Sequence, residues 1–427
     1  MKAATRGTEE PATSAESSSG VQRDSRPRLT CTDLFCGAGA LALGFHQAGF
    51  ETVLAVDNEP SAVQTFNENL GPRAVLADLT TPLELPPTDI IIGGPPCQGF
   101  SSAGLRRWGD ARNTLIGWFA QTVAQLQPRA FLFENVEGFL TGEDGRWLID
   151  LLEPLVEAGY RIHLRKVNAA NYGVPQHRKR VIAVGGLGFD PTFPLPTHTA
   201  RGAPGAHLAG RHLPPGPTLA EALTGLPPAS PVLPGYPDDH YYRPLAGVDL
   251  QRCHGLGQGQ TMRDLPEDLW HDSYRRRAHR RVMDGTPTER RGGAPAALRR
   301  LHADQPSKAV TSAAVREFIH PHEDRLLTLR EAARLQTFPD DFHFLGSFSE
   351  RAQLIGNAVP PRLAEVFARQ LSRDLSEPSR VAERGALISF VPTLSQGMSP
   401  ALAYTASVVA SMFQRPAGRV DQTALCL

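Results

Sequence analysis

Short apolar runs alternate with amphipathic stretches along the first half of the chain. The apolar runs predict buried strands at 29–35, 51–57, 74–78, 89–94, 130–136, 161–169 and 180–186. Two of the stretches between them, 40–49 and 60–70, have the pattern of helices, and the second begins with a proline, which favours the first turn of a helix. Strands that alternate with helices predict an α/β fold with a doubly wound, mostly parallel sheet.

The alternation stops near residue 190 and returns after residue 306. The residues between these points are rich in Pro, Gly, His and Arg and have weak periodicity, which predicts a second domain inserted into the first. The first residues are polar and are predicted to be disordered, and the last ones show no pattern that predicts an element. The predicted division is a tail, a domain in two parts, an insert and an extension: 1–28, 29–189 with 307–374, 190–306, and 375–427.

Composition narrows the class of protein. Lys plus Arg and Asp plus Glu both number 44, so the net charge is zero and any basic patch for nucleic acid must be local. Five cysteines without a CxxC pair disfavour a disulfide framework or a zinc ribbon. The N-terminus lacks an apolar signal core, and the apolar run at 401–413 is too short to span a bilayer. We therefore expect a cytoplasmic protein that binds no membrane.

A glycine turn follows the first predicted strand. Gly37 and Gly39 lie between that strand and the first helix, where glycine lets a ligand approach the backbone. Asp57 ends the second strand, at a spacing that suits a hydrogen bond to a ribose, and Asp78 ends the third and could contact an adenine amino group. Four residues separate Gly39 from Gly44, so the dinucleotide fingerprint is incomplete and NAD is disfavoured. A plain packing turn is the alternative.

A single cysteine stands at the end of the strand at 89–94. In the stretch "GGPPCQGF", Cys97 follows two prolines that fix the backbone and precedes a glycine-containing polar loop. Ligands of open α/β sheets bind beyond the carboxyl ends of the strands, where this thiol is expected to lie. A nucleophilic cysteine must be accessible and must reach the thiolate form. Cys97 is therefore a candidate nucleophile, with an inert thiol as the alternative.

Polar and charged residues lie at the ends of two further predicted strands. Glu134 and Asn135 end the strand at 130–136, and a carboxyl group in an apolar setting can hold or give a proton because its pKa is raised. Gln176, Arg178 and Arg180 alternate in "PQHRKR", which puts all three on one face. Arginine can fix a carboxylate or donate to a carbonyl. The alternatives are a surface acid at a strand end and an ordinary basic edge strand.

Seven motifs in sequence order resemble the cytosine-5 DNA methyltransferase family of bacterial restriction–modification type. They are "DLFCGAGA", "VDNEP", "GGPPCQGFS", "ENVEG", "PQHRKR", "REAARLQTFPD" and "GNAVP". The resemblance covers roughly 29–190 and 307–373 and implies the S-adenosylmethionine-dependent methyltransferase fold. It implies that S-adenosylmethionine is the cofactor, that double-stranded DNA is the partner, and that the insert is the target-recognition domain. A cognate restriction endonuclease and action as a monomer on DNA are further expectations.

The resemblance also implies a mechanism. The Cys97 thiolate would add to carbon 6 of a cytosine, which makes carbon 5 nucleophilic toward a methyl group. Glu134 would contact ring nitrogen 3, Arg180 would donate to the cytosine carbonyl, Arg178 would hold Glu134, and Asn135 would shape the loop around the cysteine. The base must be flipped out of the duplex to be reached.

A cofactor pocket is implied in the same way. The glycine turn would surround the methionine and adenosine parts of the cofactor, with the strand-end acids on ribose and adenine. Asn58 stands where some relatives carry an aromatic residue that stacks on adenine, and Pro60 is a substitute for it. The implied cofactor residues are Phe35, Gly37, Gly39, Asp57, Asn58, Asp78, Pro96, Leu115, Asn357 and Val359.

Two basic stretches and one polar residue are candidates for DNA contacts. The loop "SSAGLRRWGDARNTL" looks like the family's mobile loop, and the insert carries "SYRRRAHRR", a local basic patch in a neutral protein. The candidate residues are Gln176, Arg106, Arg112, Arg275, Arg276, Arg277, Arg280 and Arg281. No four-ligand spacing predicts a metal site.

Three alternatives to a DNA cytosine-5 methyltransferase remain. A tRNA cytosine-5 methyltransferase on the same fold is disfavoured because the insert is large and carries a basic patch. A catalytically inactive DNA-binding regulator is disfavoured because Cys97, Glu134 and both arginines are present. A NAD oxidoreductase is disfavoured by the glycine spacing.

Overall fold

The computed structural model describes most of the chain. The described residues are 28–79, 83–96, 115–210, 212–231, 239–278, 298–377, 384–394 and 397–413. Several candidates from the sequence lie outside them, namely Cys97, Arg106, Arg112, Arg280, Arg281 and all but the last residue of the predicted tail 1–28. The side chains of Arg276 and Arg277 are not described either. No helix in the described part is both long and apolar enough to cross a membrane.

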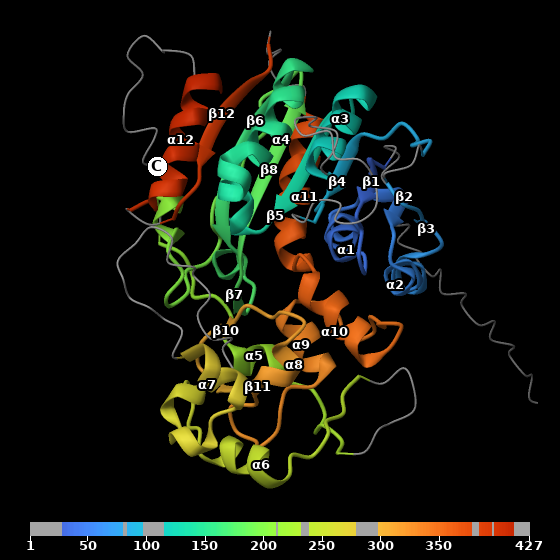
Figure 1. The fold of residues 1–427 in the computed structure, drawn as a ribbon. Coiled ribbons are helices and arrows are strands. Elements are labelled where there is room, and N and C mark those ends of the chain that lie inside the picture. Colours follow the sequence, from blue (N-terminus) through green and yellow to red (C-terminus); the bar gives the residue numbers. More distant parts are fainter. Residues whose placement is uncertain are drawn as a thin grey trace, which may run out of the picture.

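One eight-stranded sheet forms the centre of the protein (Figure 1). The strand order is β12-β6-β8-β5-β4-β1-β2-β3, and every neighbouring pair is parallel except those that β8 makes with β5 and β6. The strands are β1 (Thr30–Leu34), β2 (Glu51–Asp57), β3 (Ala74–Leu76), β4 (Ile90–Gly93), β5 (Ala130–Asn135), β6 (Tyr160–Asn168), β8 (Lys179–Leu187) and β12 (Ala386–Val391). The predicted α/β fold with a mostly parallel, doubly wound sheet is confirmed.

Helices cover both faces of the sheet. Successive side chains of a strand point to opposite faces, so a strand that is apolar along several residues needs cover on both. In β5, Phe131 and Phe133 pack into one apolar cluster, whereas Ala130 and Leu132 pack into the other. The first cluster is covered by α3 (Leu115–Leu126), η2 (Glu137–Gly145), α4 (Arg146–Glu157) and α12 (Pro400–Phe413), and the second by α1 (Ala40–Gln47) and α11 (Pro361–Ser376). The helix α2 (Pro60–Leu70) packs beside β3.

Helices α1 and α11 touch through a glycine. A Cβ atom on Gly44 would lie 2.5 Å from the Cβ of Ala364 and 2.6 Å from the carbonyl oxygen of Pro361. Backbone is fixed, so only glycine permits this approach. The contact joins a helix that precedes the insert to one that follows it, which closes the two-part domain.

The segment between β8 and α10 forms most of a second body below the sheet (Figure 1). Its own apolar cluster contains Cys253, Leu256, Met262, Leu265, Tyr274, Leu298 and Ile319, so its packing extends beyond the predicted boundary at residue 306. Its elements and those that join it to the sheet are η3 (Ala169–Tyr172), β7 (Gln176–His177), η4 (Ala206–Ala209), α5 (Leu219–Leu223), α6 (Gly247–His254), η5 (Met262–Asp264), η6 (Glu267–Leu269), α7 (Asp272–Ala278), β9 (Arg299–Arg300), β10 (Ser307–Lys308), α8 (Ala314–Glu317), β11 (Phe318–Ile319), α9 (Leu329–Leu335) and α10 (Phe348–Asn357).

Part of the extension at 375–427 joins the sheet, although its sequence predicted no element. Strand β12 pairs in parallel with β6, and the Ser389 hydroxyl accepts a 2.9 Å hydrogen bond from Nε of Arg165. Helix α12 packs on η2 and inserts Val409 into the core. This helix carries apolar residues on most sides, so its sequence lacks the helical alternation of polar and apolar positions that would reveal it.

The close contact of α1 with α11 predicts the effect of one added methyl group. Gly44→Ala should lower the free energy of unfolding by about 1–3 kcal/mol, because the new Cβ overlaps backbone that cannot move freely. Urea unfolding measures this change. Gly138→Ala is the matched control, since a Cβ at Gly138 meets nothing within 4 Å. A Gly44→Ala protein as stable as the control would contradict the predicted close packing.

Candidate active site

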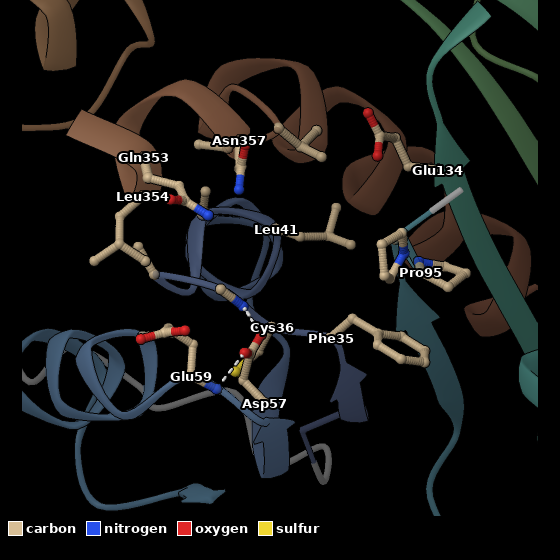
Figure 2. Close-up of a pocket in the computed structure, with 18 of the residues that line it drawn as sticks. Phe35, Cys36, Leu41, Asp57, Glu59, Pro95, Glu134, Gln353, Leu354 and Asn357 are labelled. Atoms are coloured by element: carbon tan, nitrogen blue, oxygen red, sulfur yellow. Dashed lines mark hydrogen bonds between the residues drawn. The ribbon is translucent and has the colours of Figure 1, made fainter. Parts of the chain in front are cut away.

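A cavity of about 860 Å³ opens at the carboxyl ends of β1, β2, β4 and β5 (Figure 2). Parallel strands bring these ends to one edge of the sheet, so residues far apart in sequence meet there. Helix α10 forms the opposite wall and contributes Gln353, Leu354 and Asn357 (Figure 2).

Most residues singled out from the sequence line this cavity. The predicted cofactor residues that do so are Phe35, Gly37, Asp57, Asn58, Asp78, Pro96, Leu115, Asn357 and Val359. The predicted catalytic residues that do so are Glu134, Asn135, Arg178 and Arg180. The structure therefore brings the two predicted groups together in a single cavity.

The turn after β1 is held by an acid from β2. The Gly37 N–H donates to Oδ2 of Asp57 over 2.8 Å, and both Phe35 and Gly37 have left-handed φ values, of 62° and 53°. Gly39 is not among the residues that line the cavity, and its predicted contact with the cofactor stays a prediction. A Cβ at Gly39 would lie 2.6 Å from the ring of Phe66 on α2, so this glycine is required for helix packing.

Two neighbouring acids, Asp57 and Glu59, line the cavity at the end of β2. The second carboxylate oxygen of Asp57 accepts the Glu59 N–H over 3.0 Å, so each of its two oxygens accepts a hydrogen bond from a backbone N–H. Burial raises the pKa of Asp57. Glu59 lines the same cavity and is exposed (Figure 2). The sequence interpretation missed Glu59, although it stands in the motif "VDNEP" two residues after the strand-end acid.

A third acid lies deeper in the wall and was also missed. Asp33 is 1% exposed and is a charged residue within the buried part of β1. Burial, and then the charge of Asp57, raise the pKa of Asp33 well above its usual range. The signal in the sequence was a charged residue inside an apolar run.

Glu134 is paired with Arg180, which corrects one predicted role. The Nε atom of Arg180 lies 2.6 Å from a carboxylate oxygen of Glu134. Arg178, predicted to hold Glu134, instead donates from its two terminal nitrogens to the carbonyls of Val310 (2.7 Å) and Gly356 (2.8 Å). It is 1% exposed, and burial lowers the pKa of its guanidinium. Its hydrogen bonds therefore join segments of the fold around the cavity, and its predicted action on Glu134 is limited to the attraction between the two charges.

Asn135 connects β5 to the segment that precedes Cys97. Its side-chain amide donates to the carbonyl of Pro95 over 3.0 Å, and its oxygen accepts the Val136 N–H over 2.9 Å. Pro96 lines the cavity, and Cys97, the next residue, lies outside the described residues. The bond to Pro95 agrees with the predicted role of Asn135 in shaping this segment.

Gln176 does not fit its predicted contact with DNA. Its side chain is completely buried, its amide donates to the Leu335 carbonyl and to Oε1 of Gln336 over 2.7 Å each, and its oxygen accepts the Val310 N–H over 3.0 Å. The alternation in "PQHRKR" therefore turns this residue toward the interior. Arg275 is exposed and donates to the carbonyl of Glu267, and its contact with DNA stays a prediction.

Comparison with known proteins identifies the family. The family model described as "C-5 cytosine-specific DNA methylase" matches residues 29–199 and 254–373, which is more than half of the chain. The protein belongs to the C-5 cytosine-specific DNA methylase family. This confirms the family and the enzyme class that the motif order implied.

Individual relatives of this methylase agree. The chain is 34% identical over 353 residues to the Type II methyltransferase M1.HphI of Haemophilus parahaemolyticus, covering 80% of this chain and 86% of that protein. It is 32% identical over 428 residues to M.AgeI of Thalassovita gelatinovora, covering 81% and 99%. A solved DNA modification methyltransferase encoded within an E. coli prophage has a TM-score of 0.54 and 28% identity, covering 82% of this chain and all of that one.

The raised pKa of Asp33 predicts how the stability of this methylase depends on pH. The folded protein binds the proton of the Asp33 carboxyl group more tightly than the unfolded chain does. Protonation of Asp33 therefore stabilises the fold below the unfolded pKa, and this stabilisation is lost as pH rises through the folded pKa. Asp33→Asn removes that loss. The difference in unfolding free energy, variant minus wild type, should therefore increase from pH 5 to pH 8 in urea titrations. A difference that stays constant across this range would contradict a buried, proton-holding Asp33.

Proposed function

We propose that the protein methylates carbon 5 of cytosine within a specific duplex DNA sequence, with S-adenosylmethionine as the methyl donor. The observation that supports this most is the shared cavity, in which the Glu134–Arg180 pair and the glycine turn beside Asp57 line one space. A cofactor and a flipped base must meet for methyl transfer, and one cavity provides for both.

The lining of the cavity fits S-adenosylmethionine. Carboxylates at one end can accept hydrogen bonds from a ribose and an adenine amino group, and the glycine turn leaves backbone open to a ligand. When bound, the cofactor supplies an electrophilic methyl group. Glu59 is the proposed ligand of the ribose hydroxyls, because its exposed side chain lines the cavity, whereas each oxygen of Asp57 already accepts one backbone N–H. Asp57 then acts by holding the turn, and Asp78 is the proposed partner of the adenine.

The proposed catalytic residues act on the cytosine. The Cys97 thiolate adds to carbon 6 and makes carbon 5 nucleophilic, and it leaves again when the carbon 5 proton has been removed. Glu134 contacts ring nitrogen 3 and keeps charge from building up on the ring. Arg180 stabilises the Glu134 carboxylate directly and is the proposed donor to the cytosine carbonyl. Asn135 fixes the backbone before the cysteine through the carbonyl of Pro95.

The surroundings of the reaction are proposed on the same basis. The base is flipped out of the duplex, and the insert acts as the target-recognition domain, with the basic stretch around Arg275 on the DNA backbone. The names of the relatives, Type II methyltransferases, support a restriction–modification context with a cognate endonuclease. Action as a monomer on DNA in the cytoplasm completes the proposal.

Loss of the cysteine thiol should abolish methyl transfer. Cys97→Ser should transfer no measurable label from S-adenosylmethionine to plasmid DNA, because a serine hydroxyl does not form the reactive anion at neutral pH. It should still bind the cofactor in calorimetry. Bisulfite sequencing of plasmid treated with wild type should map the modified cytosines.

Two results would contradict the proposal. Turnover of Cys97→Ser near that of wild type would show that Cys97 is not the nucleophile. Labelling of tRNA by the wild-type protein without labelling of duplex DNA would instead favour the tRNA alternative.

Glu59 and Asp57 can be separated by experiment. Glu59→Gln should weaken S-adenosylmethionine binding about tenfold, since a charged hydrogen bond contributes roughly 1.5–3 kcal/mol, and should leave the melting temperature unchanged because the residue is exposed. Asp57→Asn should lower the melting temperature as well, because it disturbs the turn. Glu68→Gln, an exposed acid on α2 outside the cavity, is the matched control. Equal cofactor affinity of Glu59→Gln and this control would exclude Glu59 as the ribose ligand.

A further inference from the structure

Helix α10 lies between the cofactor cavity and the inserted segment. One side of it lines the cavity with Gln353, Leu354 and Asn357 (Figure 2). Arg351, one turn before Leu354, is only 7% exposed, and its side chain does not line the cavity. The position of the cavity wall therefore depends on what holds this helix.

The end of α10 nearest the active site is held by residues of the catalytic part. Arg178 donates to the carbonyl of Gly356 over 2.8 Å, and Gln336 donates to the carbonyl of Ile355. A Cβ at Gly356 would lie 2.2 Å from the backbone nitrogen of Ser312, so the helix also touches the backbone of the preceding segment.

The first turns of α10 are held by the insert. The Arg351 guanidinium forms an ion pair with the carboxylate of Asp239, and the Tyr241 hydroxyl lies 3.5 Å from its other terminal nitrogen. The Asp239 side chain is completely buried. Arg330 of α9 approaches the same carboxylate to 3.7 Å, and its backbone N–H donates to the Asp239 carbonyl over 3.2 Å. One buried carboxylate thus faces two guanidinium groups from two helices.

The residue after Asp239 fixes this segment in place. Nδ1 of His240 lies 2.9 Å from the hydroxyl of Thr328, the N-cap of α9, and Nε2 lies 2.8 Å from the carbonyl of Pro227. The ion pair with Arg351 therefore connects α10 to a segment that is itself anchored. A buried ion pair that loses one member leaves an uncompensated buried charge, which strongly destabilises the contact between the segments that carried the pair.

We propose that Asp239 and Arg351 are positioning residues for the cofactor, through which the target-recognition segment sets the wall of the cofactor cavity. The carboxylate fixes Arg351, Arg351 fixes the first turns of α10, and the next turn presents Gln353 and Leu354 to the cavity. Cofactor affinity then depends on Asp239, which does not line the cavity and is not one of the proposed catalytic residues. This inference rests on the proposed binding of S-adenosylmethionine.

The test is a cofactor titration of the full-length protein by calorimetry. Asp239→Asn keeps the shape of the side chain and removes its charge, and it should raise the Kd for S-adenosylmethionine about tenfold. In steady-state assays on plasmid DNA, the KM for the cofactor should increase by a similar factor, while kcat and the KM for DNA change less than twofold.

A matched control separates positioning from general loss of stability. Glu331 of α9 and Arg325, which precedes that helix, form an equally buried ion pair, and neither lines the cavity. Glu331→Gln should lower the melting temperature and leave the cofactor Kd within twofold of wild type. Should Asp239→Asn not fold, Arg351→Lys takes its place, because it keeps the charge and loses only the planar geometry.

Three outcomes are decisive. An unchanged Kd in a folded Asp239→Asn or Arg351→Lys protein overturns the inference. An equal loss of affinity in Glu331→Gln overturns it as well, because the effect would then be one of stability. A wild-type protein that does not bind S-adenosylmethionine refutes the proposed function itself, which keeps the two failures distinct.

Discussion

The buried guanidinium of Arg178 is the interaction on which the arrangement of the active site depends. Arg178 lies directly before β8, and its guanidinium donates to the carbonyl groups of Val310 and Gly356, each more than a hundred residues further along the chain. Gln176 makes a parallel set of bonds to Leu335 and Gln336. A buried cation without such acceptors would carry a large desolvation penalty, so the three segments must stay together. The cavity exists because the segment after the insert is tied to the sheet in this way.

All strands of the sheet except β12 were predictable from the sequence because each has an apolar run of its own. The strand from Ala130 to Asn135 is buried along its length and its first four residues are apolar, and such apolar runs predict the strands of a parallel sheet. The position of the site was also predictable, because the carboxyl ends of parallel strands lie at one edge of the sheet and the polar residues at these ends lie close together. Glu134 and Asp57 were found for this reason.

The partners of the site residues were not predictable, because they are set by tertiary contacts. The motif "PQHRKR" indicates that its arginines face one way, but it does not say that Arg180 meets Glu134 while Arg178 turns to backbone carbonyls. Gln176 was taken for a surface residue for the same reason. Strand β12 was missed because it follows a helix at the far end of the chain and joins β6 across a long separation in sequence.

The C-terminal end of the insert is tied to the catalytic part by one short ladder. Residues 307–308, which directly follow the insert, pair in parallel with residues 176–177, which lie just before Arg178 and β8. This end of the insert is thereby held beside the guanidinium that joins the segments around the cavity. The contact of Asp239 with Arg351 adds a second connection, from within the insert to α10. Under the inference above, it is the contact through which the insert and the cofactor can influence each other.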